Sequence, residues 1–420
     1  MPTATLAAAI AAALILLRLA AELGLARLNA RHVLKHADAV PDAFKDLIAP
    51  PVYAKSVEYT LAKSRLGQVE DAYHAAVLLG LLFSGLLPHA FQFFADRLGN
   101  SALAAAAFLF AVGAALALTG LPFDWHAQFR LEEKFGFNTT TPKTWWADRL
   151  KGLLLSLALG YPLLVLVLKL VEWTGAAWWL WAWGAVLAFQ LLMAVLAPVL
   201  ILPLFNKFTP LPEGALRDRL LRLAARTRFR AGSIQVMDGS KRSRHSNAFF
   251  TGFGRARKIV LFDTLIQQLA EPELEAVLAH EIGHFKKKHI PKMLLFSALT
   301  SLAGFYLIAV LAKQAWFYRA FGFAPGPAEN VAPALLLFGL LAGVFTFWLS
   351  PLAHWWSRRY EYQADAFAAQ VMNEPQSLIG ALRKLNEKNL GNLTPHPLYS
   401  GFYYSHPALL EREQALRRAS

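Results

Sequence analysis

The sequence contains no cysteine among its 420 residues. It therefore forms no disulfide, has no thiolate nucleophile, and must build any metal site from His, Asp or Glu side chains. Charged residues are also scarce, at 17%, while hydrophobic residues reach 56% and the mean hydropathy is +0.37. This combination excludes a disordered chain and does not fit an average soluble protein. The composition indicates a membrane protein.

Seven apolar runs are each long enough to cross a bilayer of about 30 Å, which takes roughly 20 helical residues. They lie near residues 2–24, 72–95, 101–121, 152–172, 177–203, 293–312 and 332–356. The first run has no basic residue before it and is a poor signal peptide, so we expect it to be retained. We predict a mainly α-helical, polytopic membrane protein with seven transmembrane helices.

Lys and Arg residues are distributed unevenly between the connections. Alternate connections carry 37 of them on one side and 4 on the other, and the short connections alone carry 12 against 4. The positive-inside rule then predicts a cytosolic C-terminus and an outside or lumenal N-terminus. The formal charge of +14 is explained by topology and anionic lipid, so we expect a lipid bilayer and no nucleic acid as partner. The sequence carries no signal for an oligomeric state.

The spans divide the chain into four parts. Residues 1–203 hold the first five helices with cytosolic loops at 25–71 and 122–151, and residues 204–292 form a polar cytosolic segment. Residues 293–356 hold the last two helices, and residues 357–420 form a cytosolic tail.

The segment 204–292 has the pattern of a small sheet followed by a helix. Leucines at helical spacing predict a surface helix within 210–230. Alternating residues predict strands over 233–237, 247–253 and 258–262, with a glycine turn signal at 252–254. A further helix is expected from Glu271, because Pro272 suits the first turn and the acidic residues there complement the helix dipole.

This last helix carries the sequence HEIGH at 280–284. His280 and His284 are four residues apart, so both imidazoles project from one helix face and can bind a single ion, with Glu281 beside them. Zn²⁺ binds neutral imidazole, keeps a position open for water and lowers the pKa of that water, so that a neighbouring carboxylate can deprotonate it. The pattern predicts one zinc ion per chain, against the alternative of an amphipathic helix with incidental polar residues.

A catalytic zinc site needs a third protein ligand. The stretch RRYEYQADAFAAQ, just after the seventh span, places Glu361 and Asp365 four residues apart on a helical extension of that span. Glu361 as ligand and Asp365 as hydrogen-bond acceptor for a ligand histidine would complete a His₂Glu site. A solvated helix face that makes ion pairs with Arg358 and Arg359 is the alternative, and the spacing alone leaves the two about even.

Six motifs together carry a resemblance to a known family. They are EEKFGFN at 132–138, HSNAFFTGFG at 245–254, VLFDTL at 260–265, HEIGH at 280–284, EYQADAFA at 361–368 and SHPALLER at 405–412. In this order and around these spans, the chain resembles the type 1 CAAX prenyl endopeptidases, which are integral-membrane zinc metallopeptidases. The resemblance covers essentially the whole chain.

The resemblance implies a role for each residue of the site. It makes His280, His284 and Glu361 the zinc ligands and Glu281 the general base that activates water. It also implies supporting roles for four further residues: a carboxylate behind a ligand histidine (Asp365), an oxyanion stabiliser (His406), a residue that braces it (Arg412), and a side chain that hydrogen-bonds the backbone of an extended substrate (Asn247).

The resemblance also implies a fold and a substrate. The fold would be a ring of seven long helices around a water-filled chamber, with a small α+β, gluzincin-like zinc domain on the cytosolic side. The substrates would be isoprenylated CAAX-type proteins, cleaved near the C-terminus, or other membrane-associated peptides. The membrane would be the bacterial inner membrane or the endoplasmic reticulum.

Several alternatives stay open at this point. A quality-control membrane metalloprotease has the same zinc motif but fewer spans. A site-2-type protease carries the motif inside a span, which the three lysines after HEIGH disfavour. A channel or transporter would carry the motif by chance. His289, which follows these lysines, is expected at a solvated helix end, and His245 is left without a role.

Overall fold

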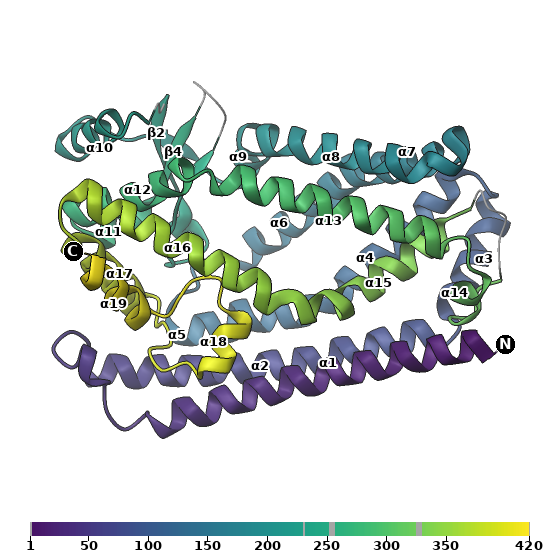
Figure 1. Cartoon of the computed structure of the whole chain (residues 1–420), viewed down its shortest axis with the longest axis horizontal. Coiled ribbons are helices and arrows are strands. Elements are labelled where there is room, and N and C mark those ends of the chain that lie inside the picture. The colour runs from purple at the N-terminus through teal and green to yellow at the C-terminus, as the bar shows by residue number, and fades with distance from the viewer. Residues whose placement is uncertain (1, 230–231, 252–256, 325–329, 420) are drawn as a thin grey trace.

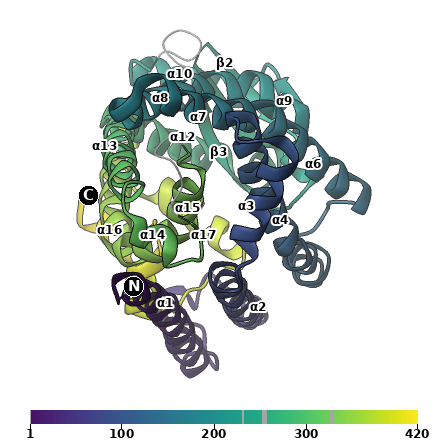
Figure 2. The ribbon, with the colours of Figure 1, turned by 90° about the vertical axis from the view of Figure 1, so that its right-hand side faces the viewer.

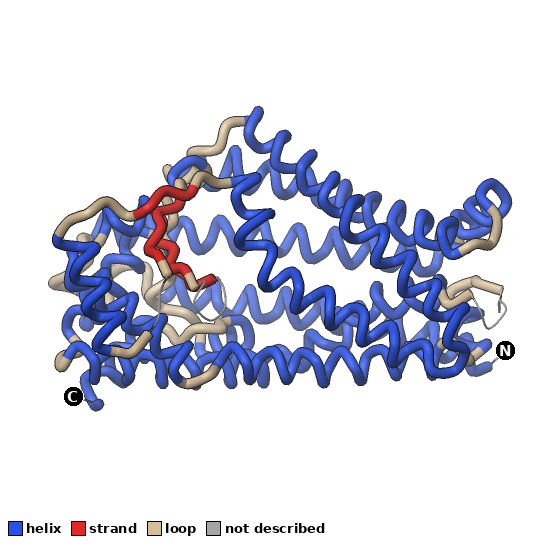
Figure 3. The backbone as a smooth tube through the Cα atoms, turned by 90° about the horizontal axis from the view of Figure 1, so that it is seen from above, coloured by secondary structure: helices blue, strands red, loops and turns tan. Residues whose placement is uncertain are grey.

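The computed structural model describes residues 2–229, 232–251, 257–324 and 330–419. Long helices extend along the longest axis of the molecule, and a small sheet lies toward the end that holds the C-terminus (Figures 1 and 3). The N-terminus lies at the opposite end. The prediction of a mainly helical chain with a small sheet domain is confirmed.

The first half of the chain is almost entirely helical. Its helices are α1 (Pro2–Lys35), α2 (Pro50–Phe83), α3 (Leu86–Leu98), α4 (Ala102–His126), α5 (Glu133–Phe135), α6 (Pro142–Leu155), α7 (Tyr161–Thr174), α8 (Trp178–Leu196) and α9 (Leu202–Phe205). The second half adds α10 (Ala215–Arg226), α11 (Asp263–Gln268), α12 (Glu271–Lys286), α13 (His289–Leu311), α14 (Ala315–Arg319), α15 (Ala332–Thr346), α16 (Ser350–Met372), α17 (Gln376–Lys388), α18 (Pro397–Tyr403) and α19 (Leu409–Ala419).

Five helical stretches in the described ranges are long and apolar enough to cross a membrane. They are Pro2–Lys35, Ala102–Phe135, Pro142–Phe205, His289–Leu311 and Ala332–Met372. The pair α2 and α3 makes a sixth if it counts as one span. The chain is therefore an integral, multi-pass membrane protein with five to six candidate spans.

The expected span at 72–95 is bent. Helix α2 ends at Phe83, α3 begins at Leu86, and the two axes differ by 57°. Gly85 between them has a φ of 79°, a left-handed conformation that glycine adopts without the steric penalty of a Cβ atom. The run expected at 72–95 is therefore a bent pair of helices, which passes as a membrane span only when the two are taken together.

The cytosolic connections expected at 25–71 and 122–151 are mostly helix. Helix α1 continues to Lys35 and α2 starts at Pro50, so each has 34 residues. At 1.5 Å per residue each is about 50 Å long, which exceeds the bilayer core by about 20 Å. Hydropathy marks where a helix leaves lipid, and α1 and α2 both extend beyond that point into the connection.

The sheet has four strands in the described part of the chain: β1 (Phe208–Pro210), β2 (Ser233–Met237), β3 (Ala248–Thr251) and β4 (Lys258–Phe262). Their order is β1-β2-β4-β3, and β2 and β4 are parallel while the outer pairs are antiparallel. The strands expected at 233–237 and 258–262 are confirmed with these bounds, and β1 was not expected. The turn signal at 252–254 lies outside the described residues. Among the described strands, β3 is an edge strand and pairs with β4.

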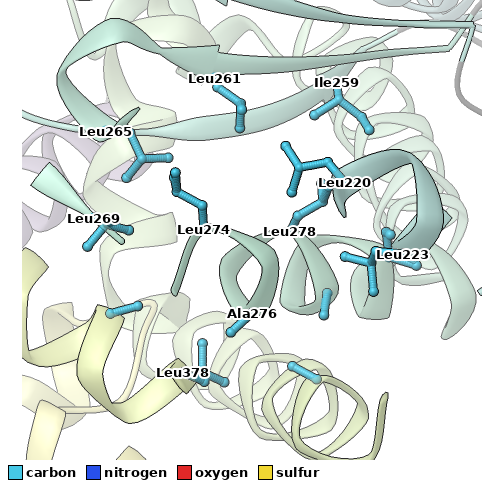
Figure 4. Packing of buried hydrophobic residues seen from close by; sticks show 14 of the residues in the cluster. Leu220, Leu223, Ile259, Leu261, Leu265, Leu269, Leu274, Ala276, Leu278 and Leu378 are labelled. Atoms are coloured by element: carbon cyan, nitrogen blue, oxygen red, sulfur yellow. The ribbon is translucent and has the colours of Figure 1, made fainter. Parts of the chain in front are cut away.

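A buried apolar core fixes helix α12 against this sheet. Leu274 and Leu278 of α12 are 2% and 1% exposed and face Ile259 and Leu261 of β4 (Figure 4). Another side of α12 packs on Leu378 of α17. Each fully buried leucine contributes roughly 1.5–3 kcal/mol to folding. The helix that carries HEIGH is therefore held on two sides by rigid elements.

Seen along the longest axis, the helices are arranged around a centre (Figure 2). Around it lie helices α1, α2, α3, α4, α7, α8, α13 and α15, with β3, α12 and α17 behind them at the far end. A polar cavity of about 430 Å³ lies between α1, α2 and the segment 389–404, and Glu22, Lys63 and Asp71 line it. Ionisable side chains within these helices thus face protein and not only lipid.

Candidate metal centre

Helices α12 and α16 make the most extensive helix–helix contact in the described ranges. Gly283, inside HEIGH, accounts for their closeness. A Cβ atom on Gly283 would lie 3.0 Å from the Cα and 3.1 Å from the carbonyl oxygen of Ala364 in α16. Carbon atoms ordinarily pack at about 3.5–4.0 Å. The glycine therefore lets the HEIGH and EYQADAFA helices approach more closely than a side chain would allow.

Three potential ligand atoms meet across this contact. His280 Nε2 lies 3.1 Å from His284 Nε2, and Glu361 Oε1 lies 3.2 Å from His284 Nε2. Glu361 Oε2 is 3.5 Å from His280 Nε2. One ligand atom from each of the three residues falls within 4.8 Å of the others. The structure thus brings together the three residues expected to bind the metal.

The chemistry of this cluster fits a cation. Glu361 is 4% exposed, and its Oε2 accepts no hydrogen bond from any described residue. Burial lowers the pKa of His280, but the carboxylates of Asp365 and Glu361 outweigh it and raise the pKa to about 9. The negative charge of these two carboxylates that favours a proton on His280 also favours a divalent cation at the same place. Two ligands bound at about 2.0–2.1 Å in a tetrahedral site would lie about 3.3 Å apart, close to the separation of the two imidazole nitrogens.

A second layer of polar residues supports His280. Asp365 Oδ1 accepts a hydrogen bond from His280 Nδ1 at 2.8 Å, which leaves Nε2 free to bind an ion. Arg412 of α19 in turn donates to both oxygens of Asp365, at 2.8 and 2.5 Å. Asp365 is 1% and Arg412 9% exposed. The alternative of a solvated acidic face is therefore wrong, and Arg358 instead donates to backbone carbonyls of residues 400, 401 and 404.

Two further expected residues lie at the cluster. Glu281 follows His280 on α12, is half-buried, and has a carboxyl pKa that burial raises above its ordinary value. A raised pKa makes its carboxylate a stronger base. His406 Nε2 lies 3.6 Å from Glu361 Oε1, its Nδ1 is 3.0 Å from Ser405 Oγ, and its side chain is 65% exposed. His406 thus borders the cluster and remains accessible to a substrate.

Asn247 lies at the start of the edge strand β3. Its side chain is exposed, and its Oδ1 accepts a hydrogen bond from the backbone N–H of Ala248 at 2.8 Å. Its backbone carbonyl accepts from the N–H of Phe262 in β4 at 3.1 Å. Strand β3 packs against α12. The structure places Asn247 at the edge of the sheet, next to the helix of the ligands, without a contact to the cluster itself among the described residues.

The expectation for His289 is wrong. It lies at the start of α13 but is 0% exposed. Lys288 adopts a left-handed conformation, with φ 57°, and turns the chain so that His289 points back toward α16. There its ring stacks on Tyr360 with centroids 4.0 Å apart. The three preceding lysines predicted a solvent-exposed helix end, and no sequence pattern marked the change of chain direction at Lys288.

His245 connects two of the motifs. Its Nε2 lies 3.2 Å from Glu132 Oε2 and its Nδ1 2.9 Å from Asn389 Oδ1. Glu132 also accepts a hydrogen bond from Tyr59 of α2 at 2.6 Å. The His245 ring stacks on Phe137 with centroids 4.2 Å apart. The motifs EEKFGFN and HSNAFF are therefore in contact through His245. Because both motifs belong to the resemblance, a contact between them could have been inferred, with His245 as one of its residues.

The class of protein follows from the site and the membrane helices together. Two histidines and a glutamate that can hold a metal, with Glu281 beside them, are typical of a metallopeptidase, and here they belong to a multi-pass membrane protein. Comparison with known proteins gives the same class. Residues 210–420 match "Peptidase family M48", and residues 29–207 match "CAAX prenyl protease N-terminal, five membrane helices". The chain belongs to peptidase family M48, in the group whose N-terminal half is that of the CAAX prenyl proteases.

Individual relatives agree over nearly their full length. "CAAX prenyl protease 1" of Saccharomyces cerevisiae is 37% identical, over 90% of this chain and 88% of the relative. The human "CAAX prenyl protease 1 homolog" is 32% identical, over 92% and 90%. The crystal structure of S. mikatae Ste24p superimposes with a TM-score of 0.89 at 35% identity and covers 97% of this chain and 98% of that one. The resemblance stated from the six motifs is confirmed.

Proposed function

We propose that this chain is a zinc-dependent endopeptidase of the membrane that hydrolyses a peptide bond near the C-terminus of isoprenylated CAAX-type proteins. The observation that carries the proposal is the cluster of His280, His284 and Glu361, in a chain whose relatives are named CAAX prenyl proteases. One carboxylate oxygen of the buried Glu361 accepts no hydrogen bond among the described residues. Two imidazoles and one carboxylate are the donor set of a catalytic zinc site, which keeps a position open for water.

Glu281 is the base of the reaction. His280, His284 and Glu361 would hold the zinc ion, which would lower the pKa of a bound water and polarise a carbonyl group. The Glu281 carboxylate takes the proton as the water oxygen attacks the scissile carbonyl carbon, and gives a proton to the leaving amine as the C–N bond breaks. Its neighbouring position on α12 and its partial burial support this role.

His406 stabilises the charge that develops on the carbonyl oxygen. Two observations support this role: His406 Nε2 lies 3.6 Å from Glu361 Oε1, and its exposed ring is open to a substrate carbonyl. Arg412 was expected to brace His406, but its hydrogen bonds favour a different role, the support of Asp365. Its two hydrogen bonds to Asp365 hold that carboxylate against His280.

The free edge of β3 holds the substrate backbone. An extended peptide can add to an edge strand through main-chain hydrogen bonds, and Asn247 supplies a side-chain amide at the start of that strand. Because β3 packs on α12, a peptide added there passes beside the ligand helix. The side chain of Asn247 is exposed and can rotate toward such a peptide.

The membrane arrangement comprises seven spans with the catalytic segment in the cytosol. The stretch Pro142–Phe205 has 64 residues and contains the turn Gly175–Ala177, at which α7 and α8 fold against each other, so we count it as two spans. The distribution of 37 against 4 basic residues supports an outside or lumenal N-terminus, in the endoplasmic reticulum membrane or in a bacterial inner membrane. The ring of helices and the polar cavity beside α1 and α2 support an internal chamber.

An isoprenyl chain explains why such a peptidase lies in a bilayer. Each buried CH₂ group contributes about 0.8 kcal/mol to membrane binding, so the lipid concentrates the substrate next to the enzyme. The test uses purified, zinc-loaded protein in nanodiscs and two peptides of one CAAX-type sequence, with and without farnesyl on the cysteine. Mass spectrometry of the products should show one cleavage near the C-terminus of the farnesylated peptide and much slower cleavage of the other.

The same measurement separates the alternatives. Equal cleavage of both peptides would assign the chain to quality control of non-prenylated membrane substrates. Cleavage of neither peptide, by a protein that carries zinc, would refute the proposed substrate class. The Glu281→Gln variant is the matched control, because it keeps all three ligands and should cleave neither peptide.

A further inference from the structure

His289 is a buried histidine in direct contact with a residue of the metal cluster. Its Nδ1 lies 3.1 Å from Nδ1 of His284, the ring nitrogen that faces away from the cluster. Its Nε2 lies 3.0 Å from Oε1 of Gln363 on α16. Stacking on Tyr360, with an angle of 11° between the rings, fixes the plane of the imidazole. Each of its two nitrogens therefore has a single defined partner among the described residues.

The metal cluster determines which atom donates in each hydrogen bond of the series His284–His289–Gln363. His284 Nε2 must offer its lone pair to an ion, so the hydrogen of this neutral imidazole is on Nδ1. The nearest partner of that N–H is Nδ1 of His289, which must therefore carry no hydrogen and accept the bond. His289 then carries its own hydrogen on Nε2 and donates it to the oxygen of Gln363. The partner of His289 Nε2 must therefore be an acceptor, and it is the amide oxygen Oε1 of Gln363.

The two ligand histidines therefore have separate supports. Asp365 accepts from His280 Nδ1 at 2.8 Å, and His289 accepts from His284 Nδ1 at 3.1 Å. Arg412 orients the first acceptor, and Gln363 orients the second. The first support is charged and the second is neutral, so only the first adds negative charge to the site.

We propose that His289 is a positioning residue, which with Gln363 fixes the ring orientation and the tautomer of His284 for metal binding. The proposal rests on the proposed function, because it takes His284 as a ligand. Groups that orient a ligand in this way typically change metal affinity by about 10–100-fold when they are removed. A histidine kept only for packing would instead be replaceable by any ring of similar shape.

The test measures zinc affinity of the full-length protein in nanodiscs by competition with a chelator. His289→Phe keeps the ring and its stacking on Tyr360 but has no acceptor, and we expect it to bind zinc about 10–100-fold more weakly than the wild type. His289→Asn restores a carbonyl acceptor and should recover part of the loss. Wild-type affinity in His289→Phe would overturn the proposal.

A second pair of variants decides the matter if His289→Phe does not fold. Gln363 is exposed, so its substitution leaves the core intact. Gln363→Leu removes the oxygen and should weaken zinc binding, while Gln363→Glu keeps an oxygen acceptor and should bind zinc more tightly than Gln363→Leu. Equal affinity in these two variants would overturn the proposal. Absence of zinc binding by the wild type would instead overturn the proposed function, and this inference with it.

Discussion

The close packing of helices α12 and α16 at Gly283 can be tested by adding one methyl group at that residue. In Gly283→Ala the new Cβ atom would lie 3.0 Å from Ala364 Cα, against an ordinary separation of about 3.5–4.0 Å. Helices α12 and α16 must therefore separate by about 0.5 Å. His280 and His284 belong to one helix and Glu361 to the other, and a metal site accepts deviations of only about 0.2 Å.

We therefore expect Gly283→Ala to weaken zinc binding by about 10–100-fold, the range found when the groups that orient a ligand are disturbed. The effect on stability is smaller, since an overpacking cost of about 1–3 kcal/mol is offset by the helix propensity of Ala, about 1 kcal/mol better than Gly. Zinc affinity is measured by chelator competition and folding by thermal unfolding.

Gly152→Ala in α6 is the matched control, because a Cβ atom there meets nothing within 4 Å. It should gain slightly in stability and keep wild-type zinc affinity. If Gly283→Ala also kept wild-type zinc affinity, the argument that this glycine sets the separation of the ligand helices would be refuted.

Three further predictions concern the surroundings of the site. Arg412→Met removes both guanidinium hydrogen bonds from the buried Asp365 carboxylate and leaves it with the hydrogen bond from His280. The variant should cost about 3–5 kcal/mol in thermal unfolding, much of which Asp365→Asn in the same chain should restore; a wild-type unfolding temperature for the single variant would contradict this. His284→Ala should lower the zinc content to well below one ion per chain in elemental analysis, and unchanged content would exclude the ligand set. The hydrogen bond to Glu132 raises the pKa of His245, so its stabilisation is complete below its unfolded pKa of about 6.5 and is lost as pH rises through the higher folded value. Wild-type thermal stability should therefore fall over that range, and His245→Gln should show a smaller fall; an identical pH profile would contradict the assignment.

The sequence predicted those parts of the site that local spacing determines. HEIGH lies on a helix that starts at Glu271, as expected, because its caps and apolar positions are local properties. Glu361 and Asp365 share a helix face for the same reason. That these two helices meet at Gly283 is a property of tertiary packing, and the approach of Ala364 could not be derived from either motif alone.

The errors have a common physical origin. Hydropathy reports the medium around a segment and not its backbone conformation, so it gave the connection at 25–71 without the helices that make up most of it. Charge pattern likewise reports the residues that face water, and the lysines before His289 hid a reversal at Lys288 that buries the histidine. The three-residue strand β1 is too short to produce an alternating pattern and depends on its pairing with β2.

The central claim is that a zinc site with Glu281 as its base hydrolyses peptides. The most direct measurement compares wild type and Glu281→Gln for zinc content and for cleavage of the farnesylated peptide in the same preparation. We expect one zinc ion per chain in both proteins, with cleavage at least about 100-fold slower in the variant, since general bases contribute about 10²–10⁴-fold. Wild-type cleavage by a zinc-loaded Glu281→Gln protein would contradict the account.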